Sequence, residues 1–390
     1  MELRSQVLHG EILHPERGFQ PVPTSVEVRW DPLTGYGARL VIAPTGALFP
    51  PADPQALADL AEQTRVSCPF CPERIEQATP QLPTAIWPQG RVRRGRAVLF
   101  PNLIAYAPHA SVSVYAPELH VLPVGEMTPE LMTDNVATQV AWLGAVARHD
   151  PTARWQSVNS NYLPPSGSSL FHPHLQGAAN PVPTTFQQLL ADLPAERFDD
   201  YLTTERRLAV RHLGGTGRVQ WLAAFAPVGP AELRALVPGV SSPAELDEEL
   251  VTELGWGVAT ALGLYAELGF WSFNLALYGL PAGYPLLLRM VCRQNPRPMY
   301  RSDVTYLELL HWEAAVDVLP EELAARAGDR FRGESSALAR RQGRQPKVTT
   351  AAAGVEGRDH LAGHQAGLVG QLVDDPKPPA DPCGRVNYHR

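Results

Sequence analysis

The apolar positions of the sequence follow the period of a helix in some segments and that of a strand in others. Every fourth residue from Leu246 to Leu262 is a leucine or a valine, which places an apolar stripe along one face of a helix. Residues 271–277 have the apolar or alternating pattern of a strand, and Pro/Gly turns bound such segments. The pattern predicts an α+β fold with mostly antiparallel sheets and helices packed on them.

Two helix starts are marked in the same way. Thr128 and Ser242 can accept hydrogen bonds from the free N–H groups of a first helical turn. Pro129 and Pro243 follow them, at a position where a backbone N–H is not needed. We predict that a helix begins at each of these sites.

A similar order of features occurs in both halves of the chain. The strand-like segment before Pro117 is matched by one before Pro227, and the strand through Asn161 is matched by the strand through Asn274. A duplicated unit of about 110 residues accounts for these offsets. We therefore divide the chain into an N-terminal catalytic unit (residues 1–185), a degenerate C-terminal unit (residues 186–330) and a tail (residues 331–390) whose composition predicts disorder.

The composition of the chain argues against nucleic acid and acidic membranes as general binding partners. The 390 residues carry a formal net charge of −7, which gives no general attraction to nucleic acid or to an acidic membrane surface. No apolar run is long enough to span a bilayer, and the first residues lack the pattern of a secretory signal. The sequence predicts a cytoplasmic protein that acts on a small molecule.

The segment from His172 to Gln176 carries the candidate chemistry. Side chains alternate along a strand, so we expect His172, His174 and Gln176 on one face. The preceding Gly/Ser loop offers N–H and hydroxyl groups to phosphate oxygens. An imidazole can attack phosphorus and later leave, because its conjugate acid titrates near neutrality. The segment predicts nucleotidyl transfer with His174 as the nucleophile and Gln176 as a donor to a phosphoryl oxygen.

Two other interpretations of this segment stay open. The side chains could form the ordinary polar face of an exposed strand, although Asn161 and the Gly/Ser loop argue against that. The protein could also be a zinc-stabilised nucleotide-binding module without turnover. Such a module would bind nucleotide without forming a covalent adduct on His174.

Cys68 and Cys71 have the spacing of a zinc knuckle, which needs two further ligands. The candidates are His120 and His172, and another group in place of His120 stays open. A zinc ion held by four protein ligands has no open position, so its role would be structural, and it would fasten the nucleophile strand to a distant loop. The alternatives are a redox-active pair and an inert pair of cysteines.

The second half keeps the predicted scaffold but lacks the corresponding chemistry. Residues 285–290 read Pro-Leu-Leu-Leu-Arg-Met, which predicts apolar side chains on both faces of a strand. We expect this strand to serve as packing and as a wall of the binding site.

Together these segments resemble the galactose-1-phosphate uridylyltransferase family of the histidine-triad superfamily. The resemblance covers roughly residues 25–330, and the motifs occur in the family's order. The matching pieces are Arg29-Trp30-Asp31-Pro32-Leu33-Thr34-Gly35, Cys68-Pro69-Phe70-Cys71, Phe100-Pro101-Asn102, Ala116-Pro117-Glu118-Leu119-His120, Asn161 with Gly167-Ser168-Ser169, and His172-Pro173-His174-Leu175-Gln176.

The resemblance implies duplicated histidine-triad-like units and a ping-pong reaction. UDP-glucose would transfer its UMP group to His174, and a hexose 1-phosphate would then take that group. The resemblance also implies one structural zinc ion per chain, held by the four ligands above, and a homodimer. The substrate-binding residues that it implies are Arg29, Asn102, Asn161, Gly167, Ser168, Ser169 and, for the sugar, Glu308.

The sequence departs from the family at several positions. Tyr278 and the apolar run after Pro285 replace histidines that form a second metal site in some relatives, so we expect that site to be absent. Leu103 stands where some relatives place a polar contact to the nucleoside. Leu175 replaces a family glycine, as in dinucleoside polyphosphate phosphorylases. The alternative function is therefore that of a nucleotide-sugar or dinucleoside polyphosphate phosphorylase or adenylyltransferase.

Overall fold

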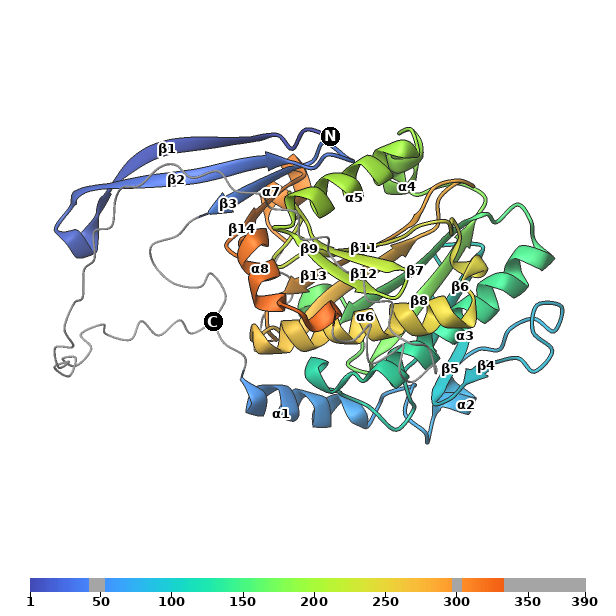
Figure 1. Ribbon diagram of the computed structural model, residues 1–390. Helices are drawn as coiled ribbons and strands as arrows, with labels where there is room; N and C mark the ends of the chain where they lie inside the picture. The colour runs from blue at the N-terminus through green and yellow to red at the C-terminus, as the bar shows by residue number, and fades with distance from the viewer. Residues whose placement is uncertain (42–52, 297–303, 333–390) are drawn as a thin grey trace. The chain divides into compact units, whose positions relative to one another are not determined.

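The structure, a computed structural model, describes residues 1–41, 53–296 and 304–332, and within these ranges ten strands form one antiparallel sheet (Figure 1). The strand order is β4-β5-β6-β8-β7-β12-β13-β11-β10-β9. The first half of the chain contributes β4 (Val92–Arg94), β5 (Ala97–Pro101), β6 (His109–Val114), β7 (Trp155–Tyr162) and β8 (His174–Asn180). The second half contributes β9 (His212–Thr216), β10 (Val219–Ala223), β11 (Leu233–Val237), β12 (Ser272–Tyr278) and β13 (Leu286–Arg293).

The order of the strands shows the duplication. Outward from the centre, one side runs β7, β8, β6, β5, β4 and the other runs β12, β13, β11, β10, β9. The central pair is β7 with β12, where Asn161 lies directly opposite Asn274. The long helices α3 (Pro129–His149) and α6 (Glu248–Glu267) contact each other and pack on one face of the sheet (Figure 1). The predicted α+β fold of two repeated units is confirmed.

One of the matches behind that prediction was wrong. The strand before Pro117 is β6, which pairs with β8. Its counterpart is β11, which pairs with β13, whereas the segment before Pro227 is the end of β10 and the residues that follow it. A short apolar strand followed by Ala-Pro is a local feature, and it does not determine the position of a strand in a sheet.

The two predicted helix starts have different outcomes. Thr128 caps α3, because its hydroxyl accepts a hydrogen bond from Leu131 N. Ser242 caps only a short 3₁₀ helix, Pro243–Glu245. The long helix α6 begins later, after Asp247, whose carboxylate accepts from Leu250 N at 2.8 Å. The second prediction was wrong because the Ser-Pro capping signal is satisfied within that single 3₁₀ turn.

The main core lies between the sheet and these two helices. The apolar stripe predicted from Leu246 to Leu262 is buried there, together with Leu175 of β8 and Val158 of β7. The opposite face of the sheet is covered over the second half by α4 (Thr185–Ala191) and α5 (Glu196–Leu208), which pack on β10, β11 and β13. Helices α1 (Pro54–Arg65) and α2 (Ile75–Ala78) flank the cysteine knuckle.

A second sheet combines the first and last described segments. Its order is β1 (Ser5–His14), β2 (Gln20–Trp30), β3 (Gly37–Val41) and β14 (Glu313–Val316), with β14 parallel to β3. Helices α7 (Tyr306–His311) and α8 (Pro320–Ala327) flank β14 in the chain. The proposed unit limits stay a prediction, and all but the first two residues of the proposed tail lie outside the described residues.

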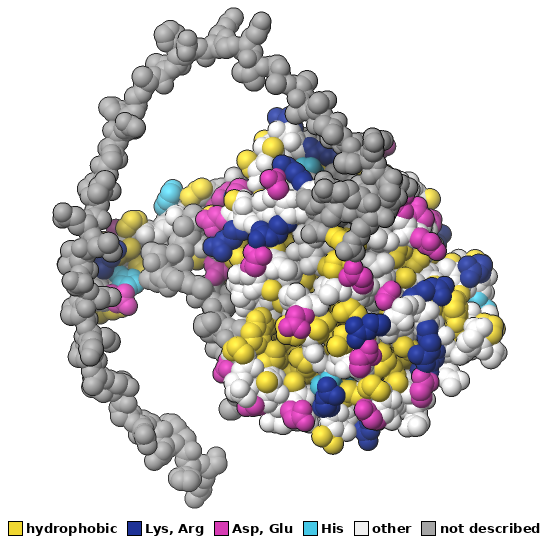
Figure 2. All heavy atoms as spheres, turned by 60° about the horizontal axis from the view of Figure 1, so that its bottom comes forward, with side chains coloured by type: hydrophobic (Ala, Val, Ile, Leu, Met, Phe, Trp, Pro, Cys, Tyr) yellow, Lys and Arg dark blue, Asp and Glu magenta, His cyan; other side chains and the backbone are white. Residues whose placement is uncertain are grey.

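Among the described residues, no helix combines the length and apolarity that a membrane span requires. Figure 2 brings the lower side of Figure 1 forward and shows hydrophobic side chains gathered between scattered charged ones. Lysine and arginine side chains alternate there with aspartate and glutamate, so this side presents charges of both signs.

Candidate active site and metal centre

The proposed nucleophile, His174, is the first residue of β8. Alternation along the strand sends Leu175 into the core beneath α3, while His174 and Gln176 lie on the other face. Asn159 and Asn161 of β7 and Asn274 of β12 alternate in the same sense and are half-buried. The middle of the sheet therefore presents one imidazole and several amides on a single, partly open face.

A hydrogen bond determines which nitrogen of His174 is free. Nδ1 lies 2.8 Å from the backbone oxygen of His172. A carbonyl oxygen can only accept, so Nδ1 carries the hydrogen and Nε2 keeps its lone pair. The ring is only 6% exposed, and burial lowers its pKa. His174 is thus a neutral imidazole at neutral pH with Nε2 available as a nucleophile.

The surroundings of His174 hold its backbone and its ring. The buried Ser160 hydroxyl donates to the carbonyl oxygen of His174 at 3.1 Å. The ring of Phe70 lies edge-on to His174, with centroids 5.6 Å apart. Behind the strand, Gly177 has no room for a side chain, because a Cβ there would lie 2.2 Å from Oε1 of Gln139. The strand that carries the nucleophile therefore packs directly against α3.

His172 faces the cysteine knuckle instead of the open face of the sheet. It precedes β8, its Nδ1 lies 3.6 Å from Sγ of Cys68 and 3.9 Å from Sγ of Cys71, and its Nε2 lies 3.0 Å from the oxygen of Ala116. Because that carbonyl accepts the Nε2 hydrogen, the Nδ1 lone pair points to the thiols. The expectation that His172, His174 and Gln176 converge on one cleft therefore holds for His174 and Gln176 only, because His172 lies before β8 and directs its Nδ1 to the thiols.

His120 is arranged in the same manner. Its Nδ1 lies 3.4 Å from Sγ of Cys71 and its Nε2 lies 3.0 Å from Oγ1 of Thr64. The Thr64 hydroxyl donates to backbone oxygens of α1, so its oxygen accepts from Nε2. The Nδ1 of His120 therefore also presents a lone pair to the thiols.

These four residues fit a tetrahedral metal ion. All are at most 3% exposed, and their donor atoms lie within 4.8 Å of one another. The S···N separations of 3.4, 3.6 and 3.9 Å match the edge of about 3.5 Å expected for a tetrahedron with zinc bond lengths. Burial raises the pKa of the Cys71 thiol to about 12, so a bound cation is needed to stabilise its thiolate. The cluster can hold zinc, and with four protein ligands it leaves no open position.

The loop from 163 to 170 carries the predicted phosphate-binding residues. Gly167 takes a positive φ of 89° at the end of the 3₁₀ turn Pro164–Ser166. Gly167 and Ser169 are exposed, whereas Ser168 is buried and donates its hydroxyl to Leu170 O at 2.7 Å. The backbone at Gly167 and the side chain of Ser169 are thus open to a ligand, and their roles stay predictions.

Three other predicted residues lie in separate surroundings. Arg29 is ion-paired with Glu27 and Glu321, both at 2.9 Å. Asn102 follows β5, and its side chain accepts a hydrogen bond from Ile104 N at 3.0 Å. Glu308, in α7, caps that helix through Thr305 N at 2.8 Å and lines a cavity of about 270 Å³ with Arg289. Their contacts to substrate also stay predictions.

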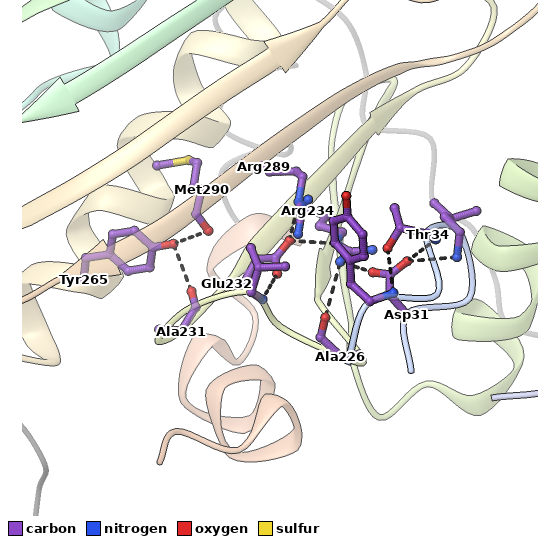
Figure 3. A network of polar contacts seen from close by, with 12 residues as sticks. Asp31, Thr34, Ala226, Ala231, Glu232, Arg234, Tyr265, Arg289 and Met290 are labelled. Carbon is purple, nitrogen blue, oxygen red and sulfur yellow. Dashed lines mark hydrogen bonds and ion pairs between the residues drawn. The ribbon is translucent and has the colours of Figure 1, made fainter. Parts of the chain in front are cut away.

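In the second half, ion pairs occupy the face of the sheet that carries the nucleophile in the first, because Arg234 and Arg289 alternate with residues of the main core. Figure 3 shows this network of ion pairs. Glu232 is the centre of a buried network of ion pairs. Its carboxylate accepts hydrogen bonds from Arg234 at 2.8 Å and from Arg289 at 2.7 Å, and Arg234 also pairs with Asp31. Burial opposes ionisation of Glu232, but the two guanidinium groups hold its pKa at about 2. The ion pair between Asp31 and Arg234 thereby fixes the segment of residues 29–35 to the second half of the chain.

The register shows what replaces each histidine. Asn159 and Ser272 stand two residues before the central asparagines of β7 and β12. Asn159 pairs with Gln176 of β8 and Ser272 pairs with Arg293 of β13, so Arg293 corresponds to Gln176. Val291 therefore occupies the position of His174, and Arg289 that of His172. The apolar side chains predicted for residues 285–290 do lie on both faces, since Leu286 and Leu288 belong to the main core and Leu287 packs under α4 and α5. The match to the first half was misplaced, because β13 extends to Arg293 and the matched window began too early. Tyr278 packs on Phe186, over whose ring Arg289 lies at 5.0 Å.

Sequence reasoning missed several residues of this site. Phe70 was noted only as part of the knuckle, and Ser160 was not considered. Asn274 served only as a landmark of the repeat, although its position opposite Asn161 follows from a two-fold relation between the units. That relation was the signal that could have identified it.

Comparison with known proteins agrees with this fold. An uncharacterised protein of Archaeoglobus fulgidus is 30% identical over 340 residues, which are 83% of this chain and 97% of that protein. The crystal structure of an ADP-glucose phosphorylase from Arabidopsis thaliana with bound ADP-glucose matches with a TM-score of 0.58 at 18% identity, covering 77% of this chain and 97% of that one. The structure of a uridylyltransferase mutant matches with a TM-score of 0.56 at 18% identity, covering 78% and 98%. No family model matches the sequence.

Proposed function

Because the chain belongs to one family with the Archaeoglobus fulgidus protein and has the fold of galactose-1-phosphate uridylyltransferases, we propose that it is a nucleotidyltransferase that works through a nucleotidyl–His174 intermediate. The donor that we propose is a nucleotide sugar, UDP-glucose, and the acceptor is a hexose 1-phosphate. The observation that carries the proposal is the tautomer of His174, whose Nε2 lone pair is set free by the hydrogen bond from Nδ1 to His172 O.

The reaction proceeds in two displacements. Nε2 of His174 attacks the α-phosphorus, the bond from phosphorus to the bridging oxygen breaks, and the sugar 1-phosphate leaves. The ring then carries positive charge, which the carbonyl of His172 stabilises at Nδ1–H. In the second step an oxygen of the acceptor phosphate attacks the same phosphorus and the N–P bond breaks. Asn161, Gln176 and the backbone near Gly167 donate to the phosphoryl oxygens in both steps.

The proposed zinc ion has a structural role. Cys68, Cys71, His120 and His172 would hold it, and when bound it supplies a rigid link between the knuckle and the segment that enters β8. The His172 ring would then be held both by the ion and by its hydrogen bond to Ala116 O. This keeps the His172 carbonyl in the position where it accepts the hydrogen bond from Nδ1 of His174.

A phosphorylase is the second candidate. Its support is the similar structure of an ADP-glucose phosphorylase, in which inorganic phosphate would replace the sugar phosphate as the acceptor. Leu175, which suggested this alternative, is 1% exposed and lies on the core side of β8, so it cannot contact either acceptor. We also propose that the protein acts as a homodimer in the cytoplasm.

The test is a two-stage labelling assay. The protein is mixed with UDP-glucose or ADP-glucose labelled in the α-phosphate, freed of unbound nucleotide, and then given galactose 1-phosphate or inorganic phosphate. We expect label from UDP-glucose to remain on the protein and to be released by galactose 1-phosphate. Release by inorganic phosphate and not by galactose 1-phosphate would instead establish the phosphorylase, and labelling by ADP-glucose alone would show that AMP, not UMP, is the transferred group. A His109→Gln variant, altered at a histidine that pairs with Asp150, serves as a control and should label normally.

A further inference from the structure

The centre of the ten-stranded sheet joins the two halves through a pair of asparagines. Asn161 of β7 and Asn274 of β12 lie directly opposite each other. Nδ2 of Asn274 is 2.7 Å from Oδ1 of Asn161 and 2.9 Å from the backbone oxygen of Ser166. A side chain from the degenerate half thus contacts both Asn161 and the Gly/Ser loop of the catalytic half.

These contacts fix the orientation of both amides. The oxygen of Ser166 is a carbonyl and can only accept, so the atom of Asn274 that faces it must be the NH₂ group. The same NH₂ group faces Asn161, so Asn161 must present its oxygen to it. The NH₂ group of Asn161 is left to point elsewhere, and it lies 4.0 Å from the position that a Cβ on Gly167 would take. One backbone carbonyl therefore determines, through Asn274, which end of Asn161 faces the exposed Gly167.

We propose that Asn274 is a positioning residue, which keeps Asn161 turned so that its NH₂ group faces the phosphoryl oxygens of the donor. This inference rests on the proposed function, because it concerns how the same site holds the nucleotide. A phosphoryl group presents only acceptors, so an Asn161 turned the other way would set oxygen against oxygen at the reacting centre. The degenerate half thereby contributes to catalysis without carrying a nucleophile.

The decisive variant is Asn274→Asp, which keeps the shape of the side chain and removes its donors. The carboxylate cannot donate to Ser166 O, and it attracts the NH₂ group of Asn161 away from the substrate. We expect the single-turnover rate of nucleotidylation of His174 to fall about a hundredfold, the loss typical of removing one donor to a developing oxyanion. In Asn274→Ala, Asn161 is free to take either orientation, and we expect a smaller loss of about tenfold.

Two comparisons separate positioning from simple destabilisation. Ser272→Ala removes another hydrogen bond between the same two strands, from its hydroxyl to Tyr162 O at 2.8 Å, and should leave the rate unchanged. In an Asn161→Ala background, Asn274→Asp should cost at most about threefold, because the residue acts mainly through Asn161. All rates are compared at a temperature at which the melting curve shows each variant to be folded.

The outcomes distinguish this inference from the proposed function. If the unaltered protein takes up no nucleotide from UDP-glucose or ADP-glucose, the proposed function fails and the positioning role fails with it. If the unaltered protein is labelled and Asn274→Asp is labelled equally fast, only the positioning role is overturned. A full additional loss in the Asn161→Ala background would likewise overturn it, because Asn274 would then act independently of Asn161.

Discussion

His172 and His174 stand two residues apart, and backbone hydrogen bonds leave opposite ring nitrogens free on them. At His174 the donor is Nδ1, so Nε2 is available for attack, whereas at His172 the donor is Nε2, so Nδ1 faces the thiols. The sequence identified both side chains as candidates. The sequence could not show which ring nitrogen of each histidine is free. The carbonyl of Ala116, which accepts from His172, is far away in the sequence and comes close only in the folded chain.

The state of His174 leads to a prediction about pH. Burial lowers the pKa of the ring below its ordinary value of about 6.5, so the neutral, nucleophilic form persists as the solution is made more acidic. At saturating donor, we expect the single-turnover rate of nucleotidylation to stay level from pH 7.5 to below pH 6.5 and to decline only at lower pH. Stopped-flow or quench measurements across this range test the prediction. A rate that is already halved near pH 6.5 would contradict it.

At the scale of elements, three segments meet at the proposed metal centre. The knuckle that follows α1 supplies Cys68 and Cys71, the segment after β6 supplies His120, and the segment before β8 supplies His172. The Cys-x-x-Cys spacing made the knuckle predictable, and His120 and His172 were already candidates for the two further ligands that zinc needs, before the motif resemblance implied the same set. The hydrogen bond from His120 to Thr64 of α1 was not predictable, since nothing in the sequence indicates that α1 approaches this loop.

Cys68→Ala tests the metal centre. Removal of one thiolate from a closed four-ligand site should reduce bound zinc from one ion per chain to a small fraction, as measured by elemental analysis. The free energy of unfolding should fall by about 4 kcal/mol or more, because loss of a structural metal is among the most damaging single changes. Cys292→Ala, which alters a buried cysteine in the second half, should keep its zinc. An unchanged zinc content in Cys68→Ala would refute the proposed site.

At the scale of the whole molecule, the duplication could be predicted from the sequence but its register could not. The strands through Asn161 and Asn274 are true counterparts, and they form the central pair of the sheet. The strand order beyond them depends on which segments pair after long connections, so the match of Pro117 with Pro227 failed. The parallel pairing of β14 with β3 joins Glu313 to Gly37, and no local pattern indicates such a distant contact.

The most direct test of the account is mass spectrometry of the protein after incubation with UDP-glucose. We predict that the intact mass increases by one UMP group, that the modified peptide is the one that contains His174, and that a His174→Gly variant gains no mass while its melting temperature stays close to that of the unaltered protein. An adduct on another residue, or full labelling of the His174→Gly variant, would contradict the claim that this imidazole is the nucleophile.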